Sequence, residues 1–377
     1  MKLIPNKRKL LYKFFIVLLT YLLIELACFI FIKTGYIPAR LPAFHFVAEN
    51  DFSMHLVKNK EWGVWHKPGQ FTYQDGCLEM DNLYNSYGAR DKERTKSSTD
   101  SNRVILLGDS FAEGFGVKEN KRFSNLLEKE TKHEMMNFSC NSFSPLQAVL
   151  MYKNLAFQYA HNTIIFGIFP FNDIPDDDID ITGNDEVYKP FLVKTDTGYS
   201  IKYTGIFNPA DSTLNKSKGS FTERTVRFLK AFTCWYNIVS YLKLRNAENK
   251  KMKSSSAKIP SYYYDYSTSQ IERLGEILKE LRKSAGDKRI IVFTIPVVQD
   301  FLRMEKEDKQ PPLPEELLKI CTENNIEFLD LTQPIKATGK PYRDFYFYCD
   351  PHWNENGHKL VADILNNQFF QTPAGHN

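Results

Sequence analysis

Short apolar runs alternate with helical segments along most of the chain, and this alternation restricts the possible fold more than any other feature. The runs cover residues 103–107, 135–138, 163–169, 289–298 and 326–331. They consist mostly of Ile, Val, Leu, Phe and Met, which is typical of strands buried on both faces of a parallel sheet. Helical patterns occupy residues 123–132, 145–159, 269–284, 314–324 and 356–367. The sequence therefore predicts an α/β fold, a doubly wound parallel sheet covered by helices on both faces.

Composition divides the chain into four segments. We expect a basic tail at residues 1–13, a membrane anchor at 14–32, a lead-in segment at 33–102 and the α/β domain at 103–377. Residues 92–102 are polar and predict a loop. The alternation breaks between about residues 176 and 266, which we interpret as an insertion. Because this insertion leaves the sheet beside a strand end, we expect it to cover the site and select the substrate.

The anchor is predicted from an apolar stretch, FFIVLLTYLLIELACFIFI, at residues 14–32, whose only charge is Glu25. At ~1.5 Å per residue, such a helix spans roughly the ~30 Å hydrocarbon layer of a bilayer. Five basic residues precede it, so the positive-inside rule places the amino terminus in the cytoplasm and the body outside. Three alternatives remain: a cleaved signal peptide, a lipoprotein box at residues 26–28, and a buried core helix.

The formal charge of +4 is concentrated at the amino terminus. Residues 1–33 hold six basic residues and one acid, whereas the remaining chain holds 43 basic and 44 acidic residues. The body is therefore nearly neutral, and we expect no nucleic-acid partner. The six cysteines are scattered and include no C-x-x-C pair, which predicts buried thiols rather than a zinc ribbon or redox motif. Acidic residues 176–180 lack metal-loop spacing, and we interpret them as a solvated acidic loop without metal.

Residues suited to nucleophilic catalysis follow the first predicted strand. Gly108, Asp109 and Ser110 come directly after residues 103–107. A serine hydroxyl is a weak nucleophile, so it needs a nearby base and donors for the developing oxyanion. A sharp turn after a strand can present such a serine, although turns of this kind are also common as purely structural features.

Two further polar groups follow later strands. Asn172 and Asp173 come just after the third strand, where an Asn amide can stabilise an oxyanion or simply form a turn. Asp350 and His352 lie on one loop after the last strand, where the carboxylate can orient the imidazole. His358 falls within the last predicted helix and is expected to be structural. Since ligands of such sheets bind beyond the carboxyl ends of the strands, these groups should meet at one edge.

The three pieces, GDSF at residues 108–111, FND at 171–173 and DPHWN at 350–354, resemble the motifs of the SGNH, or GDSL-type, hydrolase superfamily. The resemblance covers roughly residues 103–370 apart from the insertion. Residues 85–90 also resemble the segment before the nucleophile in membrane-anchored members. The resemblance implies a flavodoxin-like three-layer fold and ester chemistry that uses no metal or other cofactor.

By motif match, the resemblance implies that Ser110 is the nucleophile, His352 the general base and Asp350 the residue that orients His352. The remaining expected site residues donate to the oxyanion or support the motifs: the Ser110 N–H, Ser142, Asn172, Gly108, Asp109 and Asp173.

Two positions depart from the family pattern. Ser142 stands near the place where the family has a Gly that donates its backbone N–H, and a serine lacks the conformational freedom of glycine. Asp350 and His352 are two residues apart, whereas three is the commoner spacing in the family.

The predicted anchor and the family resemblance together imply an extracytoplasmic serine esterase or O-acyltransferase that acts on O-acetyl groups of cell-envelope glycan. One alternative is a catalytically degenerate envelope protein on the same fold that binds glycan or scaffolds an assembly. Another is a lipase that acts on membrane lipid. Lys250 to Lys258 form a basic, Ser-rich stretch, for which a flexible linker is favoured over contact with anionic headgroups.

Overall fold

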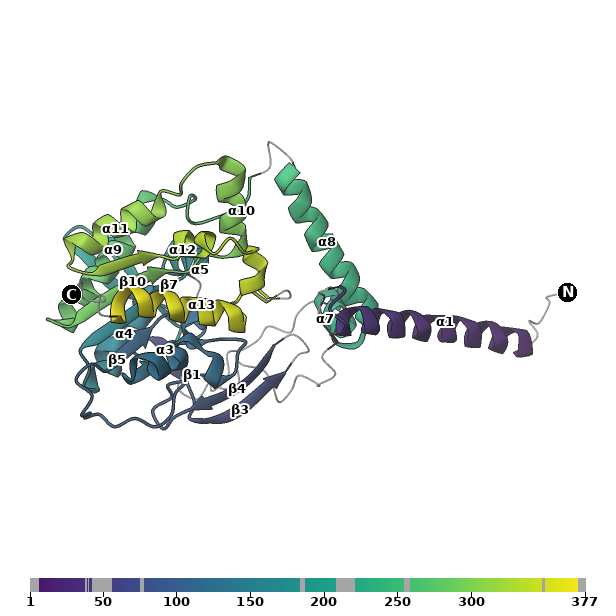
Figure 1. Cartoon of the computed structure of the whole chain (residues 1–377), viewed down its shortest axis with the longest axis horizontal. Coiled ribbons are helices and arrows are strands. Elements are labelled where there is room, and N and C mark those ends of the chain that lie inside the picture. Colours follow the sequence, from purple (N-terminus) through teal and green to yellow (C-terminus); the bar gives the residue numbers. More distant parts are fainter. Residues whose placement is uncertain are drawn as a thin grey trace, which may run out of the picture.

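The computed structural model describes residues 7–37, 39, 41–42, 56–74, 78–183, 187–207, 221–253, 258–347 and 350–371 (Figure 1). Its centre is a five-stranded parallel sheet with the order β11-β10-β7-β5-β6. The strands are β5 (Val104–Leu107), β6 (Met135–Asn137), β7 (Thr163–Ile168), β10 (Arg289–Thr294) and β11 (Glu327–Asp330). Counted along the chain, this is the 2-1-3-4-5 order of flavodoxin-like sheets. The predicted α/β class, and the position of all five strands, are confirmed.

Helices cover both faces of the sheet. α4 (Pro145–Asn154), α9 (Thr268–Ala285) and α11 (Leu313–Glu323) contact one another on one face. α3 (Phe123–Thr131) and α13 (Glu355–Leu365) contact each other on the opposite face. Every residue of β5 and β7 is buried, because each strand is covered from both sides. The remaining helices and turns of the domain are α2 (Ser110–Glu113), η2 (Glu119–Lys121), η3 (Ala156–Gln158), α5 (Pro170–Asp176), α10 (Val298–Glu307), α12 (Thr332–Ala337), η4 (Tyr342–Phe345) and η5 (Asn366–Phe370).

Local sequence signals explain where α4 and α9 begin. Ser144 accepts a hydrogen bond from the N–H of Gln147, and Pro145 occupies the first turn of α4. Ser267 and Gln270 form the equivalent capping box at the start of α9. These side chains satisfy backbone donors that have no partner within the helix, and a lost cap costs about 1 kcal/mol.

The lead-in segment contains two antiparallel hairpins that the sequence did not indicate. They are β1 (Leu56–Asn59) with β2 (Gly63–His66), and β3 (Gly69–Gln74) with β4 (Glu79–Tyr84). The strands are four to six residues long and mix charged with apolar residues. Neither the apolar alternation of a strand nor the apolar spacing of a helix therefore stands out in the sequence.

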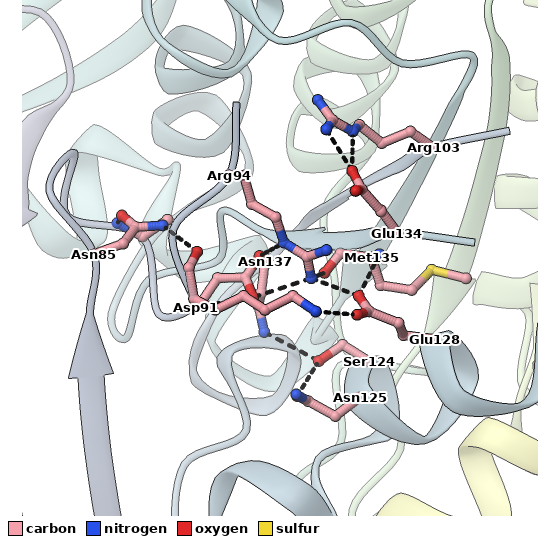
Figure 2. A network of polar contacts seen from close by, with 12 residues as sticks. Asn85, Asp91, Arg94, Arg103, Ser124, Asn125, Glu128, Glu134, Met135 and Asn137 are labelled. Carbon is pink, nitrogen blue, oxygen red and sulfur yellow. Dashed lines mark hydrogen bonds and ion pairs between the residues drawn. The ribbon is translucent and has the colours of Figure 1, made fainter. Parts of the chain in front are cut away.

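The polar stretch after β4 is a loop, as predicted, but two arginines in it and directly after it, Arg94 and Arg103, have side chains buried in ion pairs (Figure 2). The guanidinium of Arg94 bridges the carboxylates of Asp91 and Glu128, and only 3% of its side chain is exposed. Arg103 pairs with Glu134 in the same network. Since burial of charge is favourable only with such partners, the network fastens the lead-in to α3 and β6.

The acidic residues at the start of the insertion are not a solvated loop, so that interpretation is wrong. They lie at the end of α5 and around α6 (Ile179–Thr182). Asp177 accepts from the N–H of Leu146 at 3.3 Å, and Asp178 accepts from the amide of Gln270 at 3.0 Å. Burial raises the pKa of Asp177 to about 6. These carboxylates hold α5 and α6 against α4 and α9.

The rest of the described insertion forms two separate elements. The hairpin of β8 (Lys189–Thr195) and β9 (Gly198–Thr204) packs against β2, α4 and α9. α8 (Cys234–Lys253) packs against α1 (Lys7–Lys33) instead, and α7 (Phe221–Phe232) packs against α8. The expectation that the insertion covers the site remains a prediction, and residues 184–186, 208–220 and 254–257 of the insertion lie outside the described residues.

α1 extends away from the body (Figure 1). By length and composition, its residues Arg8–Lys33 form a helix that is long enough and apolar enough to cross a membrane. Most of its apolar side chains face outward and are exposed.

Candidate active site

Ser110 sits at the carboxyl end of strand β5, on a turn that requires glycine before it. Gly108 has φ +147, and a Cβ there would lie 2.6 Å from the Cβ of Ala112 and 2.9 Å from the carbonyl oxygen of Gly167. Asp109 then caps α2 by accepting from the N–H of Phe111 at 3.0 Å. Ser110 is the first residue of α2, and 4% of it is exposed.

The structure brings the three predicted catalytic side chains together. The Oγ of Ser110 lies 2.6 Å from Nε2 of His352, although 242 positions separate the two residues. Nδ1 of His352 lies 2.5 Å from Oδ1 of Asp350, which also accepts from the His352 backbone N–H at 3.0 Å. This is the arrangement of a nucleophile, a base and a group that orients the base. The spacing of two residues therefore still allows the Asp–His contact.

Backbone and aromatic contacts hold the imidazole in place. The N–H of Phe347 donates to the carbonyl of His352 at 2.9 Å. Asn354 caps α13 and donates to the carbonyl of Tyr346 at 3.0 Å. The ring of Phe111 lies 4.6 Å from the imidazole, and that of Phe115 lies 4.8 Å from it. These contacts restrict the rotation of His352.

Asp109 joins the nucleophile to Asn172. Oδ2 of Asp109 lies 3.5 Å from the Ser110 Oγ and accepts from the Asn172 amide at 3.5 Å. The amide of Asn172 is thus placed beside the nucleophile. Burial raises the pKa of Asp109 to about 6, against the opposing charge of His352.

Asp173 is buried close to Asp109, but its own hydrogen bond is to the backbone. Its carboxylate accepts from the N–H of Phe169 at 2.7 Å, at the start of α5. Burial, and then repulsion from Asp109, raise the pKa of Asp173. Asp173 therefore fixes the helix that carries Asn172 rather than facing the nucleophile directly.

The loop that carries Ser142 runs beside the nucleophile turn. The N–H of Cys140 donates to the carbonyl of Gly108 at 3.2 Å. Ser142 has φ +66, a left-handed conformation that residues with a Cβ rarely adopt. The chain at Ser142 therefore has the conformation for which glycine is the usual choice, and the serine is accommodated in it.

Glu113 was not predicted, and it connects three parts of the site. Its carboxylate accepts from the Tyr84 hydroxyl at 2.7 Å and from the N–H of Asn141 at 2.6 Å. Nε2 of His66 lies 3.6 Å from the same carboxylate. Glu113 thus ties the lead-in to the nucleophile helix and to the loop of Ser142. An acid in the otherwise uncharged stretch at residues 110–117 was the only local signal for it.

Arg90 makes a second link from the lead-in to the nucleophile helix. It is buried, and its guanidinium donates to the carbonyls of Gly114 at 2.7 Å and Val117 at 3.0 Å. The conformation of the segment before it is fixed by Asn85, whose side chain accepts from the N–H of Ala89 at 2.9 Å. The resemblance noted at residues 85–90 thus falls on a segment that supports the turn after Ser110.

Other predicted groups lie outside this arrangement. His358 is buried in α13, accepts from the N–H of Phe123 at 3.3 Å, and has its pKa lowered to about 3 by burial. Its structural interpretation is confirmed. Cys140 is buried and free, whereas Cys349 and Cys77 lie outside the described residues. Within the described residues, no group of three His, Cys, Asp or Glu side chains is arranged to hold a metal ion.

Comparison with known proteins gives matches only among solved structures. No family model and no curated protein matches the chain. A member of the lipolytic protein G-D-S-L family from Veillonella parvula has 13% sequence identity and a TM-score of 0.37, with 72% of this chain and 100% of that chain covered. An acetyl xylan esterase from Geobacillus stearothermophilus has 9% identity and a TM-score of 0.37, with 74% and 100% covered. The solved structures that this chain resembles thus include GDSL-family lipolytic proteins and acetyl xylan esterases.

Proposed function

We propose that this protein is a serine esterase or O-acyltransferase of the SGNH type, with Ser110 as its nucleophile. The observation that carries the proposal is the continuous contact from the Ser110 Oγ through His352 to Asp350, at 2.6 and 2.5 Å. A degenerate binding protein would have no need of this alignment.

The proposed reaction begins when Nε2 of His352 accepts the proton of the Ser110 hydroxyl. The Oγ attacks the ester carbonyl and forms a tetrahedral intermediate. His352 then gives its proton to the leaving alcohol, and an acyl-Ser110 remains. Water or a sugar hydroxyl, whose proton passes to His352, attacks the acyl group. As this second intermediate collapses, the bond to the Ser110 Oγ breaks and His352 returns the proton to that oxygen. Asp350 holds the imidazole in the required tautomer and stabilises its charged form.

We assign the oxyanion of both tetrahedral intermediates to three donors: the N–H of Ser110, the N–H of Ser142 and the amide of Asn172. Two observations support this assignment. The Asn172 amide and the Ser110 Oγ both lie 3.5 Å from the same oxygen of Asp109. The loop of Ser142 is fixed beside Gly108 by the Cys140 N–H, at 3.2 Å. Donors that are already oriented contribute most to such catalysis.

The proposed location is the outer face of a membrane, with the amino terminus in the cytoplasm and α1 as the anchor. An anchored body of this orientation meets cell-envelope glycan, so we propose O-acetyl groups of such glycan as the substrate. Five basic residues before the apolar stretch support the orientation.

Ester hydrolysis by the full chain in detergent tests the proposal, with p-nitrophenyl acetate as the probe. We expect turnover by the wild type and a loss of about 10³-fold or more in kcat for Ser110→Ala, because the acyl-enzyme cannot form. Ser212→Ala, a serine of the insertion far along the chain from the motifs, is the matched control and should keep full activity. Equal turnover in Ser110→Ala would contradict the assignment.

Product analysis separates the two reaction types. The enzyme is incubated with the acyl donor and a de-O-acetylated glycan acceptor, and the glycan is analysed by mass spectrometry. An acetylated glycan identifies a transferase, and release of acetate alone identifies a hydrolase.

A further inference from the structure

Two helices of the insertion, α8, which packs against α1, and α7, which packs against α8, expose an apolar face. In α7, Phe221 is 84% exposed and Phe228 is 60% exposed, and Leu242 of α8 is 44% exposed. Phe221, Phe228 and Phe232 recur at seven- and four-residue spacings, which places them on one side of the helix. Large apolar side chains grouped in this way mark a surface that contacts another molecule or a membrane.

Glu25 of α1 joins this helix pair to the anchor. Its carboxylate accepts from the N–H of Cys234, the first residue of α8, at 2.7 Å. Tyr21, one turn earlier in α1, lies near both Glu25 and Trp235. A carboxylate in an apolar membrane helix is costly without partners, and a helix amino terminus is a favourable partner for negative charge. The contact therefore gives Glu25 a role within the membrane segment.

The position of Glu25 sets the depth of this contact. It lies seven residues before Ile32, the last residue of the apolar stretch. At ~1.5 Å per residue, that is about 10 Å inside the apolar segment. α8 begins at this depth and leaves α1 at a steep angle towards α10 of the body (Figure 1). Amphipathic helices that lie in a bilayer interface bury their apolar face to about 5–10 Å.

Charge distinguishes the helix pair from the rest of the body. Residues 221–253 contain eight basic and two acidic residues, whereas the chain after residue 33 is nearly neutral as a whole. Each Lys or Arg close to an anionic membrane surface is attracted by its negative potential. An apolar face beside a strongly basic sequence fits a bilayer that carries anionic headgroups.

We propose that α7 and α8 form a second membrane contact, inserted in the anionic leaflet around the carboxyl end of α1, with Glu25 capping α8 within it. The inference rests on the proposed membrane crossing by α1. It extends that proposal, because two contacts hold the body close to the bilayer where one flexible tether would leave it free. The basic stretch that begins at Lys250 overlaps α8, which ends at Lys253, so the linker interpretation is wrong for residues 250–253.

Tryptophan fluorescence in lipid nanodiscs tests the inference with the full chain. The protein has four tryptophans, and Trp62, Trp65 and Trp353 are buried in the body at 6%, 6% and 1% exposure. α1 contains none, so only Trp235 can meet lipid. In discs with mid-chain brominated lipids, we expect the wild type to lose the emission that Trp235 supplies. Trp235→Phe should show no such loss.

Each outcome decides one part of the inference. A chain that does not assemble into discs overturns the anchoring by α1, and with it this inference. A chain that assembles but is not quenched overturns the second contact alone, and leaves a protein partner as the occupant of the apolar face. We expect quenching to be stronger with anionic than with zwitterionic lipid, and equal quenching would contradict the headgroup contact.

Variants of Glu25 test the cap. Glu25→Gln retains an oxygen that can accept from Cys234, so quenching of Trp235 should persist. Glu25→Leu removes the acceptor, and we expect quenching to fall. Quenching that is unchanged in Glu25→Leu would show that Glu25 does not position α8. Neither substitution touches the folded body, so ester hydrolysis in detergent serves as the control for folding.

Discussion

Ser142 occupies a left-handed backbone conformation, with φ +66, on the loop proposed to bind the oxyanion. Such a conformation costs a residue with a Cβ roughly 1–2 kcal/mol, and the rigid side chains that branch at Cβ tolerate it worst. The serine is therefore retained in a conformation that strains it mildly, and its N–H direction depends on that conformation.

Substitution of Ser142 tests the direction of this N–H. Ser142→Gly should keep kcat within about threefold, because glycine adopts the same conformation freely. Ser142→Val should lower kcat by roughly 10²-fold, the loss typical when one oxyanion donor is removed. Steady-state kinetics with p-nitrophenyl acetate provide the measurement. If the valine variant is as active as the wild type, Ser142 does not donate to the oxyanion.

His358 predicts a pH dependence of stability. Burial lowers its pKa to about 3 in the folded state, below its usual value of 6.5. The folded protein therefore keeps it neutral while the unfolded chain binds a proton, so stability is present above pH 6.5 and is lost as the pH falls towards 3. From pH 7 to pH 5 this contribution should fall by about 2 kcal/mol.

Thermal unfolding of the full chain in detergent, at pH 7 and pH 5, measures this contribution. His358→Gln can still accept from Phe123 but does not titrate, so its melting temperature should fall less on acidification than that of the wild type. His161, whose pKa burial also lowers, is present in both proteins and cancels in the comparison. The same pH dependence in both proteins would contradict the assignment.

Among the secondary-structure elements, those with long uniform apolar runs were predictable from the sequence. β5, β7 and β10 consist mostly of Ile, Val, Leu and Phe, because both faces of each strand are covered. α10 was missed, since it begins at Val298 where the apolar run of β10 still continues in the sequence. The lead-in hairpins were missed because their short, mixed strands carry no clear period.

Contacts between distant elements explain the other errors. The run at residues 176–180 is acidic in sequence, and its burial depends on partners such as Lys189 and Gln270, far along the chain. Glu113 has the same property, because its partners Tyr84 and Asn141 lie 29 and 28 residues away on either side. In contrast, Ser110, Asp350 and His352 were found because they occupy recognisable motifs, directly after β5 for Ser110 and on the loop before α13 for Asp350 and His352.

Glu113 tests whether the lead-in positions the site. Glu113→Gln keeps the shape but replaces one of two accepting oxygens by an NH₂ donor, so one buried N–H or O–H loses its partner. Such a loss costs about 1–3 kcal/mol. We expect kcat to fall by roughly 10-fold or more with KM nearly unchanged, because the displaced loop carries an oxyanion donor.

Two further variants complete this test. Tyr84→Phe removes only one of the two donors and should have a smaller effect on kcat. Glu93→Gln is the control, since Glu93 accepts from Ser86 at the surface of the lead-in. A Glu113→Gln protein that melts earlier but keeps its kcat would show that Glu113 only stabilises the fold.

At the scale of the whole molecule, α1 and the body lie on opposite sides of the α7–α8 contact (Figure 1). Apolar surface in α1 and basic charge before it predict that the carboxyl terminus is outside the cytoplasm. A carboxy-terminal alkaline phosphatase fusion, which is active only outside the cytoplasm, should be active, and a fluorescent reporter that folds only in the cytoplasm should be dark. The reverse pattern would contradict the proposed orientation.

The central claim is that Ser110 is an activated nucleophile at the carboxyl edge of the sheet. The most direct measurement is the reaction of the full chain in detergent with a fluorophosphonate, followed by mass-spectrometric mapping of the modified peptide. We predict one adduct, on Ser110, that is absent in Ser110→Ala and strongly reduced in His352→Gln. A folded wild type that is not labelled, or is labelled at another serine, would contradict the account.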